Sequence, residues 1–383
     1  MKNKSLIRLT VITMVLVLSI SGCLDYTITT QVNADGSLDR TVVVRGDSAS
    51  IFDGSINIPS DSTWEISTKW EEVKKNDSSA ERKYVYTARK HFANVNALNQ
   101  EIYSDSAFTK NTNIKVKINR SFRWFYTFIT YHETYQKYFP FNEIPVNDYM
   151  TKTELGVMVD SDEKNFFFDP ASNNFIRNNG KQQPPELTKS DSVTMKKRMD
   201  EISEKFDKWQ AINIIKEYFN IMKEQVKNDT TSLNILNSLK WDSDSLIEVI
   251  YRTNLNIQSS EKITNVLYQF FQNYYITQLY GQHKKSFHEF DRKLELTKLF
   301  NDDYTGDNYT NEVIMPGLLI NTNANTVEGN KVTWEFGALQ YYANNFEMVA
   351  ESRIVNRWAI ILSGIIAFVL LVLLILGIFV KRR

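Results

Sequence analysis

An acidic stretch near residue 305 carries side chains at the spacing of a calcium-binding loop. Asn301, Asp303, Thr305 and Glu312 match positions 1, 3, 5 and 12 of that loop, and Gly306 matches position 6. Carboxylate and amide oxygens are the ligands that Ca²⁺ prefers. However, Asn and Thr replace acidic ligands at two of these positions, and a strand-like sequence follows where the template has a helix. We therefore favour an ordinary turn-rich loop and retain the four residues as metal candidates.

The histidines do not form a metal-binding pattern in the sequence. His283 and His288 are five residues apart at the start of a predicted helix, and His91 and His132 lie far from them. Five residues correspond to about 140° around a helix axis, whereas residues four apart share a face. The sequence contains no Gly-x-Ser-x-Gly turn, zinc-protease motif or glycine-rich phosphate loop. It therefore predicts no catalytic residue and no cofactor.

Cys23 is the single cysteine of the chain and follows the features of a secretory signal peptide. Three basic residues precede an apolar stretch over residues 9–18, and small residues follow it. The segment 20–23, Ile-Ser-Gly-Cys, resembles the lipobox of bacterial lipoproteins, in which the thiol is diacylated and the chain is cut before it. This resemblance implies a palmitate-type anchor on Cys23 and removal of residues 1–22. An ordinary signal peptide or an uncleaved anchor is the alternative.

A second membrane attachment lies at the other end of the chain. Residues 358–380 form an almost unbroken apolar run, and Lys381, Arg382 and Arg383 follow. At about 1.5 Å of rise per residue the run covers about 34 Å, which is enough for a hydrocarbon core of about 30 Å. A single such segment must be a helix, because no water satisfies its backbone. With the secretory signal, the basic tail predicts an extracytoplasmic ectodomain on the bacterial cytoplasmic membrane and a cytoplasmic C-terminus.

The composition limits the partners and chemistry of the ectodomain. Six of the 45 Lys and Arg residues lie in the signal and the tail, which leaves 39 against 45 Asp and Glu residues. Without a dense basic patch, nucleic acid is not an expected partner. No further cysteine is available for a disulfide or for thiol chemistry, so stability must come from a buried core.

Strand patterns begin and end the ectodomain. Alternation on both sides of Asp35-Gly36 predicts a hairpin of the strands 26–32 and 38–44. Because its first strand starts almost at Cys23, we expect the domain to lie close to the bilayer. A helix is predicted over 92–102. Further strands are predicted at 64–70, 83–90, 114–118, 122–131, 155–159, 165–168, 313–320 and 332–336.

Between residues 187 and 300 the apolar residues recur every three or four positions, which is typical of amphipathic helices. We expect a long helix over 193–226, another that a capping box from Ser245 to Glu248 opens, and two more over 261–280 and 284–300. The third of these should stop at Gly281.

The fold class is therefore α+β, with an antiparallel β-rich ectodomain, a helical insertion and one C-terminal transmembrane helix. The predicted organisation is a lipoprotein signal peptide (1–22), a discontinuous β-rich domain (23–186 and 301–356), the helical insertion (187–300), the transmembrane helix (357–380) and a cytoplasmic tail (381–383).

The order of these parts resembles the LppM-type bacterial envelope lipoproteins. The similarity lies at both ends of the ectodomain and skips the helical insertion. It implies an envelope protein with an α+β ectodomain, without established catalysis, that binds lipid or glycolipid. The features that carry it are the lipobox cysteine, Asp35-Gly36, Pro316-Gly317, Asn325, Gly329-Asn330, Val332-Thr333-Trp334 and the terminal helix with its basic tail.

Two aromatic runs, 124–131 and 166–168, could line an acyl-chain groove, although their alternation indicates ordinary sheet core. We expect a non-catalytic binding or assembly module, attached to the cytoplasmic membrane by acyl chains on Cys23 and by the helix 358–380. The expected partner is a lipid, a glycolipid or an envelope protein. The alternative is an envelope hydrolase that uses carboxylates scattered through the sequence.

Overall fold

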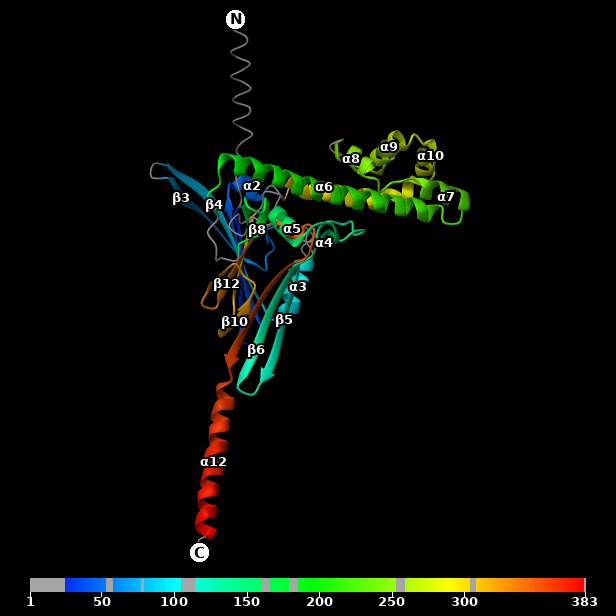
Figure 1. Ribbon diagram of the computed structural model, residues 1–383. Coiled ribbons are helices and arrows are strands. Elements are labelled where there is room, and N and C mark those ends of the chain that lie inside the picture. Colours follow the sequence, from blue (N-terminus) through cyan, green and yellow to red (C-terminus); the bar gives the residue numbers. More distant parts are fainter. Residues whose placement is uncertain are drawn as a thin grey trace.

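The computed structural model describes residues 25–52, 58–76, 79–104, 114–159, 166–178, 185–252, 259–303 and 308–381. Figure 1 shows two sheets, a long group of helices that projects sideways, and one helix, α12, that leaves the sheets at the end away from that group. We call the two sheets the β body and the helices from α6 to α11 the helical arm. Helices combined with mainly antiparallel sheets confirm the α+β class.

A seven-stranded sheet has the order β11-β12-β9-β1-β2-β4-β3. Strands β1 (Asp25–Val32) and β2 (Leu38–Gly46) form the predicted hairpin, and Gly36 in its turn has a φ of 96°, which few side chains tolerate. Strand β9 (Asn308–Ile314) runs parallel to β1, so strands from both ends of the ectodomain are neighbours. The remaining strands are β3 (Glu65–Asn76), β4 (Ser79–Phe92), β11 (Thr326–Glu328) and β12 (Lys331–Gly337).

A four-stranded sheet has the order β10-β13-β6-β5. Strands β5 (Ile114–Arg123) and β6 (Tyr126–Tyr135) form a hairpin, and β13 (Phe346–Val355) pairs with β6. Tyr126 lies opposite both Arg123 and Val355, which places the β5–β6 turn beside the start of α12 (Arg357–Lys381). The fourth strand is β10 (Leu318–Thr322), and a separate small hairpin consists of β7 (Phe166–Asp169) and β8 (Asn174–Arg177).

The two large sheets share one hydrophobic core. Leu38 and Trp334 of the seven-stranded sheet and Tyr131 and Met348 of the four-stranded sheet are all buried in it. The same core continues into the helical arm, because the Trp209 ring lies 4.9 Å from the Phe139 ring. Short helices border the sheets: α2 (Ser48–Phe52), α3 (Val95–Ser104), α4 (Val146–Tyr149) and η3 (Ala338–Tyr341).

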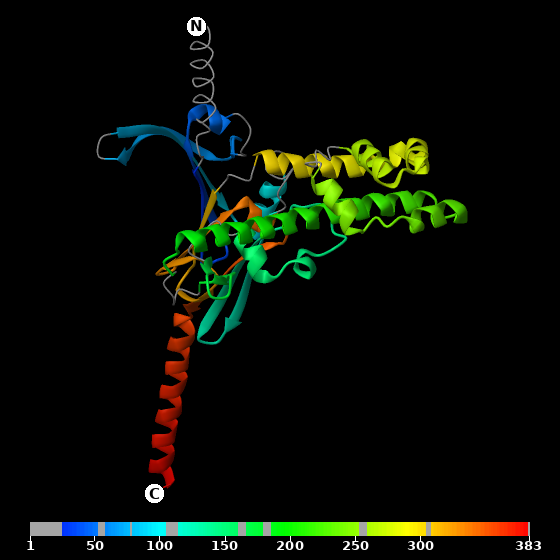
Figure 2. The ribbon, with the colours of Figure 1, turned by 45° about the horizontal axis from the view of Figure 1, so that its top comes forward.

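The helical arm begins with α6, the long helix that the sequence predicts. Its first turn is closed by a capping box between Thr188 and Asp191. Figures 1 and 2 show α6 running sideways from the β body, with α7 to α10 at its far half and α11 running back along it toward the body. These helices are α6 (Lys189–Gln225), α7 (Thr230–Ser238), α8 (Asp244–Arg252), α9 (Ser260–Phe271), α10 (Tyr274–His283), η2 (Lys284–Phe287) and α11 (His288–Asp303).

The predicted strand at 155–159 is wrong, because these residues belong to a helix, α5 (Lys152–Val159). Thr151 and Glu154 cap it reciprocally: the Glu154 N–H donates to Thr151 Oγ1 and the Thr151 N–H donates to Glu154 Oε2. Arg198 and Lys205 of α6 also pair with this carboxylate, at 3.1 and 2.8 Å. Burial raises the pKa of Glu154, but the hydrogen bonds from Lys205 and Thr151 outweigh it and bring the pKa down to about 2.

Three predicted features of the helices in the arm are also wrong. The helix expected over 261–280 is divided, because Gln272 has a φ of 48° and Asn273 caps the start of α10. The divided helix also continues past Gly281 to His283. Helix α8 begins at Asp244, and the hydroxyl of Ser243, two residues before the expected Ser245, accepts from a backbone N–H of its first turn.

Candidate membrane-facing site

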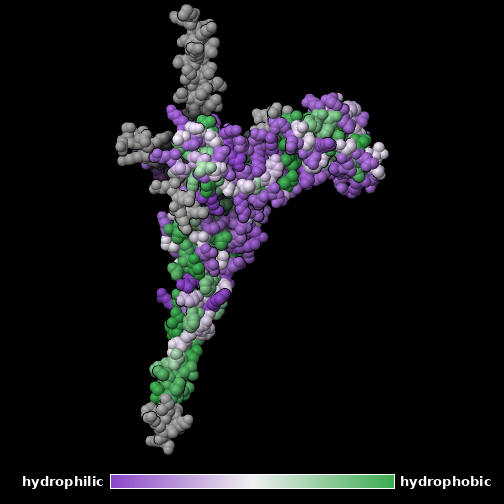
Figure 3. Space-filling view, viewed as in Figure 1, coloured by the Kyte–Doolittle hydropathy of each residue, from purple (hydrophilic) through white to green (hydrophobic). Residues whose placement is uncertain are grey.

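Helix α12 has the length and composition of a membrane span, and its surface is uncovered. Only 6% of its apolar part, within Arg357–Leu376, is buried against the rest of the chain. A core helix of similar composition would be covered by protein on all sides. Figure 3 shows α12 as an apolar column below a largely hydrophilic helical arm. This exposed apolar surface indicates membrane association.

Asn356 joins β13 to α12 and holds the β5–β6 turn against the junction. Its backbone N–H donates to the Phe125 carbonyl at 2.9 Å. Its side-chain Nδ2 donates to the carbonyls of Arg123 at 2.9 Å and Trp124 at 3.2 Å. Its Oδ1 accepts from Thr127 Oγ1 at 2.9 Å. One amide side chain therefore satisfies both strands of the turn and ties them to the first residue before the helix.

Aromatic side chains extend this contact along α12. Trp124 Nε1 donates to Ser363 Oγ at 2.7 Å, six residues beyond the first residue of the helix. The Trp358 ring stacks on Phe122, with centroids 6.0 Å apart, and meets Trp124 edge to face at 5.5 Å. The rings remain between 43 and 58% exposed. We call Phe122 to Tyr126, which form the end of this hairpin, the β5–β6 tip.

The junction is positively charged. Arg123, Arg353 and Arg357 lie at or beside it, and none of them forms an ion pair within the described part of the chain. The sequences 114–132 and 352–383 contain no Asp or Glu. The apolar tip is therefore bordered by cations whose charge no neighbouring carboxylate in these two segments balances.

A separate buried polar cluster joins the two sheets. Arg40 Nη2 of β2 lies 3.2 Å from Glu133 Oε1 of β6, and the two side chains are 5% and 0% exposed. The Tyr131 hydroxyl and Asn311 Nδ2 donate to the other oxygen of Glu133. Burial, and then the charge of Glu133, raise the pKa of Tyr131 well above its ordinary value. Every oxygen of this carboxylate is engaged, so the cluster fits a role in holding the sheets together.

The metal candidates that the structure describes lie on different elements. Asn301 and Asp303 end α11, Glu312 lies in β9, and Thr305 falls outside the described residues. The Glu312 carboxylate accepts a hydrogen bond from Lys331 Nζ at 2.8 Å. Burial raises the pKa of Glu312, but the hydrogen bonds from Lys331 and Thr29 and the charge of Lys331 together outweigh it, so the net shift is downward. Within the described ranges, no group of three or more His, Cys, Asp or Glu side chains could hold a metal ion.

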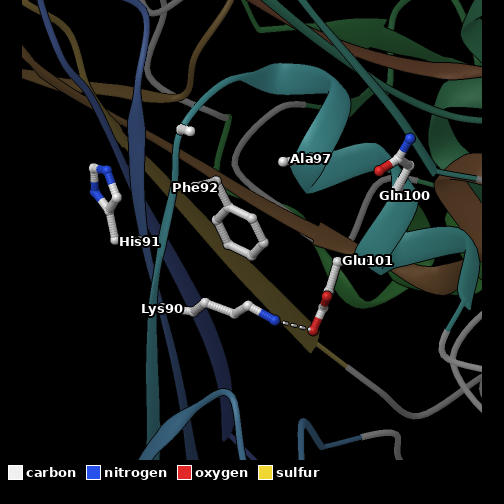
Figure 4. A pocket seen from close by; sticks show the side chains of 7 residues that line it. Lys90, His91, Phe92, Ala97, Gln100 and Glu101 are labelled. Carbon is white, nitrogen blue, oxygen red and sulfur yellow. Dashed lines mark hydrogen bonds and ion pairs between the residues drawn. The ribbon is translucent and has the colours of Figure 1, made fainter.

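Two open hollows lie on the part of the surface that the structure describes. Figure 4 shows one of about 330 Å³, in which Lys90 and Glu101 point toward each other and form an ion pair of 2.6 Å. His91 points to the other side of the strand, where its Nδ1 lies 2.7 Å from Asp39. A second hollow, of about 560 Å³, lies along α11 and includes His288. Each of these two hollows is lined by a single histidine, and neither is lined by a serine, threonine or cysteine.

The other predicted site residues differ in whether the structure describes them and in how far they are buried. Cys23 and the signal peptide lie outside the described residues. The run 124–131 divides into two parts, because Ile129 and Tyr131 are buried core residues whereas Trp124 is exposed in the tip. In the run 166–168 the Phe168 ring is buried beneath Phe175, at 5.6 Å.

The sequence interpretation missed the junction with α12. Ser363 is the single hydroxyl-bearing residue between Trp358 and Val380, and Trp124-Phe125 lies at the centre of a predicted hairpin. Together they were the available signal for this contact.

The fold and the exposed helix define an α+β protein with one candidate membrane span among its described residues. No family model and no curated protein matches the chain. A solved structure, the folded domain of the LppM protein of Mycobacterium tuberculosis determined by NMR, is 7% identical. The match covers 87% of this chain and 91% of that chain, with a TM-score of 0.26. At this level the likeness carries no ligand, site or activity over to this chain.

Proposed function

We propose that the protein is a non-catalytic binding or assembly module, held by α12 at the extracytoplasmic face of the bacterial cytoplasmic membrane. The observation that supports this most is the junction at Asn356. Four hydrogen bonds connect this residue to the β5–β6 turn, so the start of the helix and the four-stranded sheet form one unit. A span coupled in this way fixes how the body is presented to its partners.

The helical arm is the part of the molecule that this arrangement presents. Figures 1 and 2 show it projecting sideways at the end of the body away from α12. Its surface in Figure 3 is mostly hydrophilic, and the hollow on α11 is lined largely by charged side chains. A surface of this kind fits a protein or a glycan head group better than an acyl chain. We therefore favour an envelope protein or a glycolipid head group as the partner.

The buried carboxylates support a non-catalytic role. A catalytic carboxyl pair requires pKa values that its surroundings push apart. Glu133 is instead paired with Arg40, and Glu154 with Arg198 and Lys205. These charges are matched within the fold, which is the pattern of structural ion pairs.

Acylation of Cys23 stays a prediction. The first described strand, β1, begins at a different end of the β body from α12. Strand β1 begins beside the end of β2 that leads to α2, and α2 lies at the end of the body opposite α12 (Figures 1 and 2). Helix α12 therefore sets the position of the body on its bilayer, and the expectation that β1 starts close to that bilayer is not supported.

Site-specific photocrosslinking in intact cells tests the assignment of the arm. A crosslinking amino acid at Tyr274 of α10, which is 64% exposed, should give one discrete adduct. The same amino acid at Val327 of β11, which is 49% exposed on the β body, is the control and should give none. If neither Tyr274 nor Val249 of α8 gives an adduct, and no lipid or protein accompanies the gently extracted chain, the proposal fails.

A further inference from the structure

We propose that the β5–β6 tip is a second membrane contact, which enters the head-group region of the leaflet where α12 begins and binds lipid phosphate through Arg123. This inference rests on the proposal that α12 spans a bilayer. It adds a site that the predicted anchors do not include, and it names the ligand chemistry as phospholipid phosphate together with the upper part of the acyl chains.

The contact between Trp124 and Ser363 sets the depth of the tip. Ser363 lies six residues after Arg357, which is about 9 Å along the helix axis. A hydrocarbon core of about 30 Å takes up about 20 residues of helix, and α12 has 25. With the helix centred in the bilayer, Ser363 lies about 5 Å inside the hydrocarbon edge. The indole that bonds to it therefore reaches the same level.

The chemistry of this pair suits the membrane interface. A hydroxyl or an indole N–H placed in hydrocarbon without a partner is costly, whereas either group in water is satisfied by solvent. Trp124 and Ser363 satisfy each other at 2.7 Å. Tryptophan is also enriched at membrane interfaces, where its ring is apolar and its N–H finds a polar partner.

The surroundings of the pair indicate what covers the tip. Phe122, Trp124 and Phe125 are 58, 43 and 47% exposed. Their surface is continuous with the exposed apolar surface of α12, because Phe122 stacks on Trp358. Lipid that covers α12 would therefore cover the tip as well. Its cation Arg123 has no carboxylate partner among the described residues, and a phosphate at the head-group level supplies one.

A photoreactive lipid tests this contact on the full-length protein without altering it. The protein is placed in nanodiscs that contain phosphatidylglycerol with a diazirine near the glycerol end of its acyl chain, and the adducts are mapped by mass spectrometry. We expect adducts on the peptide that contains Phe122 to Tyr126 and on α12. The matched negative region is β3, where Ile66 and Trp70 are 41 and 50% exposed.

The outcomes separate the two proposals. If α12 carries adducts but the tip carries no more than β3 does, the inference is overturned and the span is not affected. An absence of adducts on α12 overturns the span itself and the inference with it.

A charge variant tests whether Arg123 recognises a lipid phosphate whose charge no choline balances. In discs with equal phosphatidylglycerol and phosphatidylcholine probes, Arg123→Gln should lower the preference of the tip for the anionic probe about fivefold, the effect of one basic residue at such a surface. Arg82→Gln on β4 is the matched control, because Arg82 lies over the Trp70 ring at 5.5 Å just as Arg123 lies over the Phe128 ring at 5.6 Å. An unchanged preference in Arg123→Gln, or one that Arg82→Gln lowers equally, overturns the phosphate assignment.

Discussion

The buried ion pair between the two sheets gives a quantitative prediction. Replacing Glu133 with Gln leaves the Arg40 guanidinium, which is 5% exposed, without a counter-charge, although the amide still offers an acceptor to Tyr131 and Asn311. Breaking a buried pair by removing one partner costs about 3–5 kcal/mol. Arg40 Nη1 already lacks a hydrogen-bond partner among the described residues, so we expect a loss near the upper end of that range.

The double variant Arg40→Met/Glu133→Gln removes both charges and keeps one amide acceptor at the site. It should cost only about 1–2 kcal/mol, so the two single variants couple by several kcal/mol. Urea unfolding of the full-length protein in detergent micelles, followed by circular dichroism, measures these free energies. The exposed pair Lys284 and Glu261, 3.2 Å apart, is the control and should show no measurable coupling. Additive single effects for Arg40 and Glu133 would refute the reasoning.

Three further predictions concern a carboxylate, the junction and a turn. Above its ordinary pKa of 4.5, Glu154 should stabilise the fold by about 3 kcal/mol, and this contribution is lost as the pH falls toward 2. The difference in unfolding free energy from Glu154→Gln should shrink over that pH range, and a constant difference would contradict the pairing. Asn356→Ala removes three side-chain hydrogen bonds of about 1 kcal/mol each, so amide exchange of residues 122–127 should accelerate while that of the β1–β2 hairpin does not. Gly317→Ala should lower the melting temperature more than Gly329→Ala does. Both glycines have positive φ, but only at position 317 would a Cβ lie 2.4 Å from a backbone oxygen, that of Arg353. Equal decreases in melting temperature would show that the Arg353 backbone moves aside without cost.

The features that the sequence predicted correctly depend on local signals. Asp35-Gly36 between two alternating segments specifies a hairpin whatever the rest of the chain does. The apolar run that becomes α12 is recognisable by composition alone. The error at residues 155–159 was also local, because the capping pair Thr151 and Glu154 was available in the sequence and was overlooked.

The junction could not be derived in the same way, because its parts are distant in the chain. The Trp124–Ser363 hydrogen bond joins residues 239 positions apart, and the Asn356–Arg123 bond joins residues 233 apart. Nothing in the alternation of β5 and β6 states which strand will pair with β6 on its other side. Only the pairing of β6 with β13 brings the hairpin turn to the start of α12.

We propose that α12 crosses a bilayer and holds the β body on it in one orientation. Electron cryomicroscopy of the full-length protein in a nanodisc, with an antibody fragment added for size, tests this most directly. We expect one arrangement, in which α12 crosses the disc, the β5–β6 tip enters its head-group region and the helical arm stands clear of it. A body that takes many orientations relative to the disc, or an α12 that lies outside the bilayer, would contradict the account.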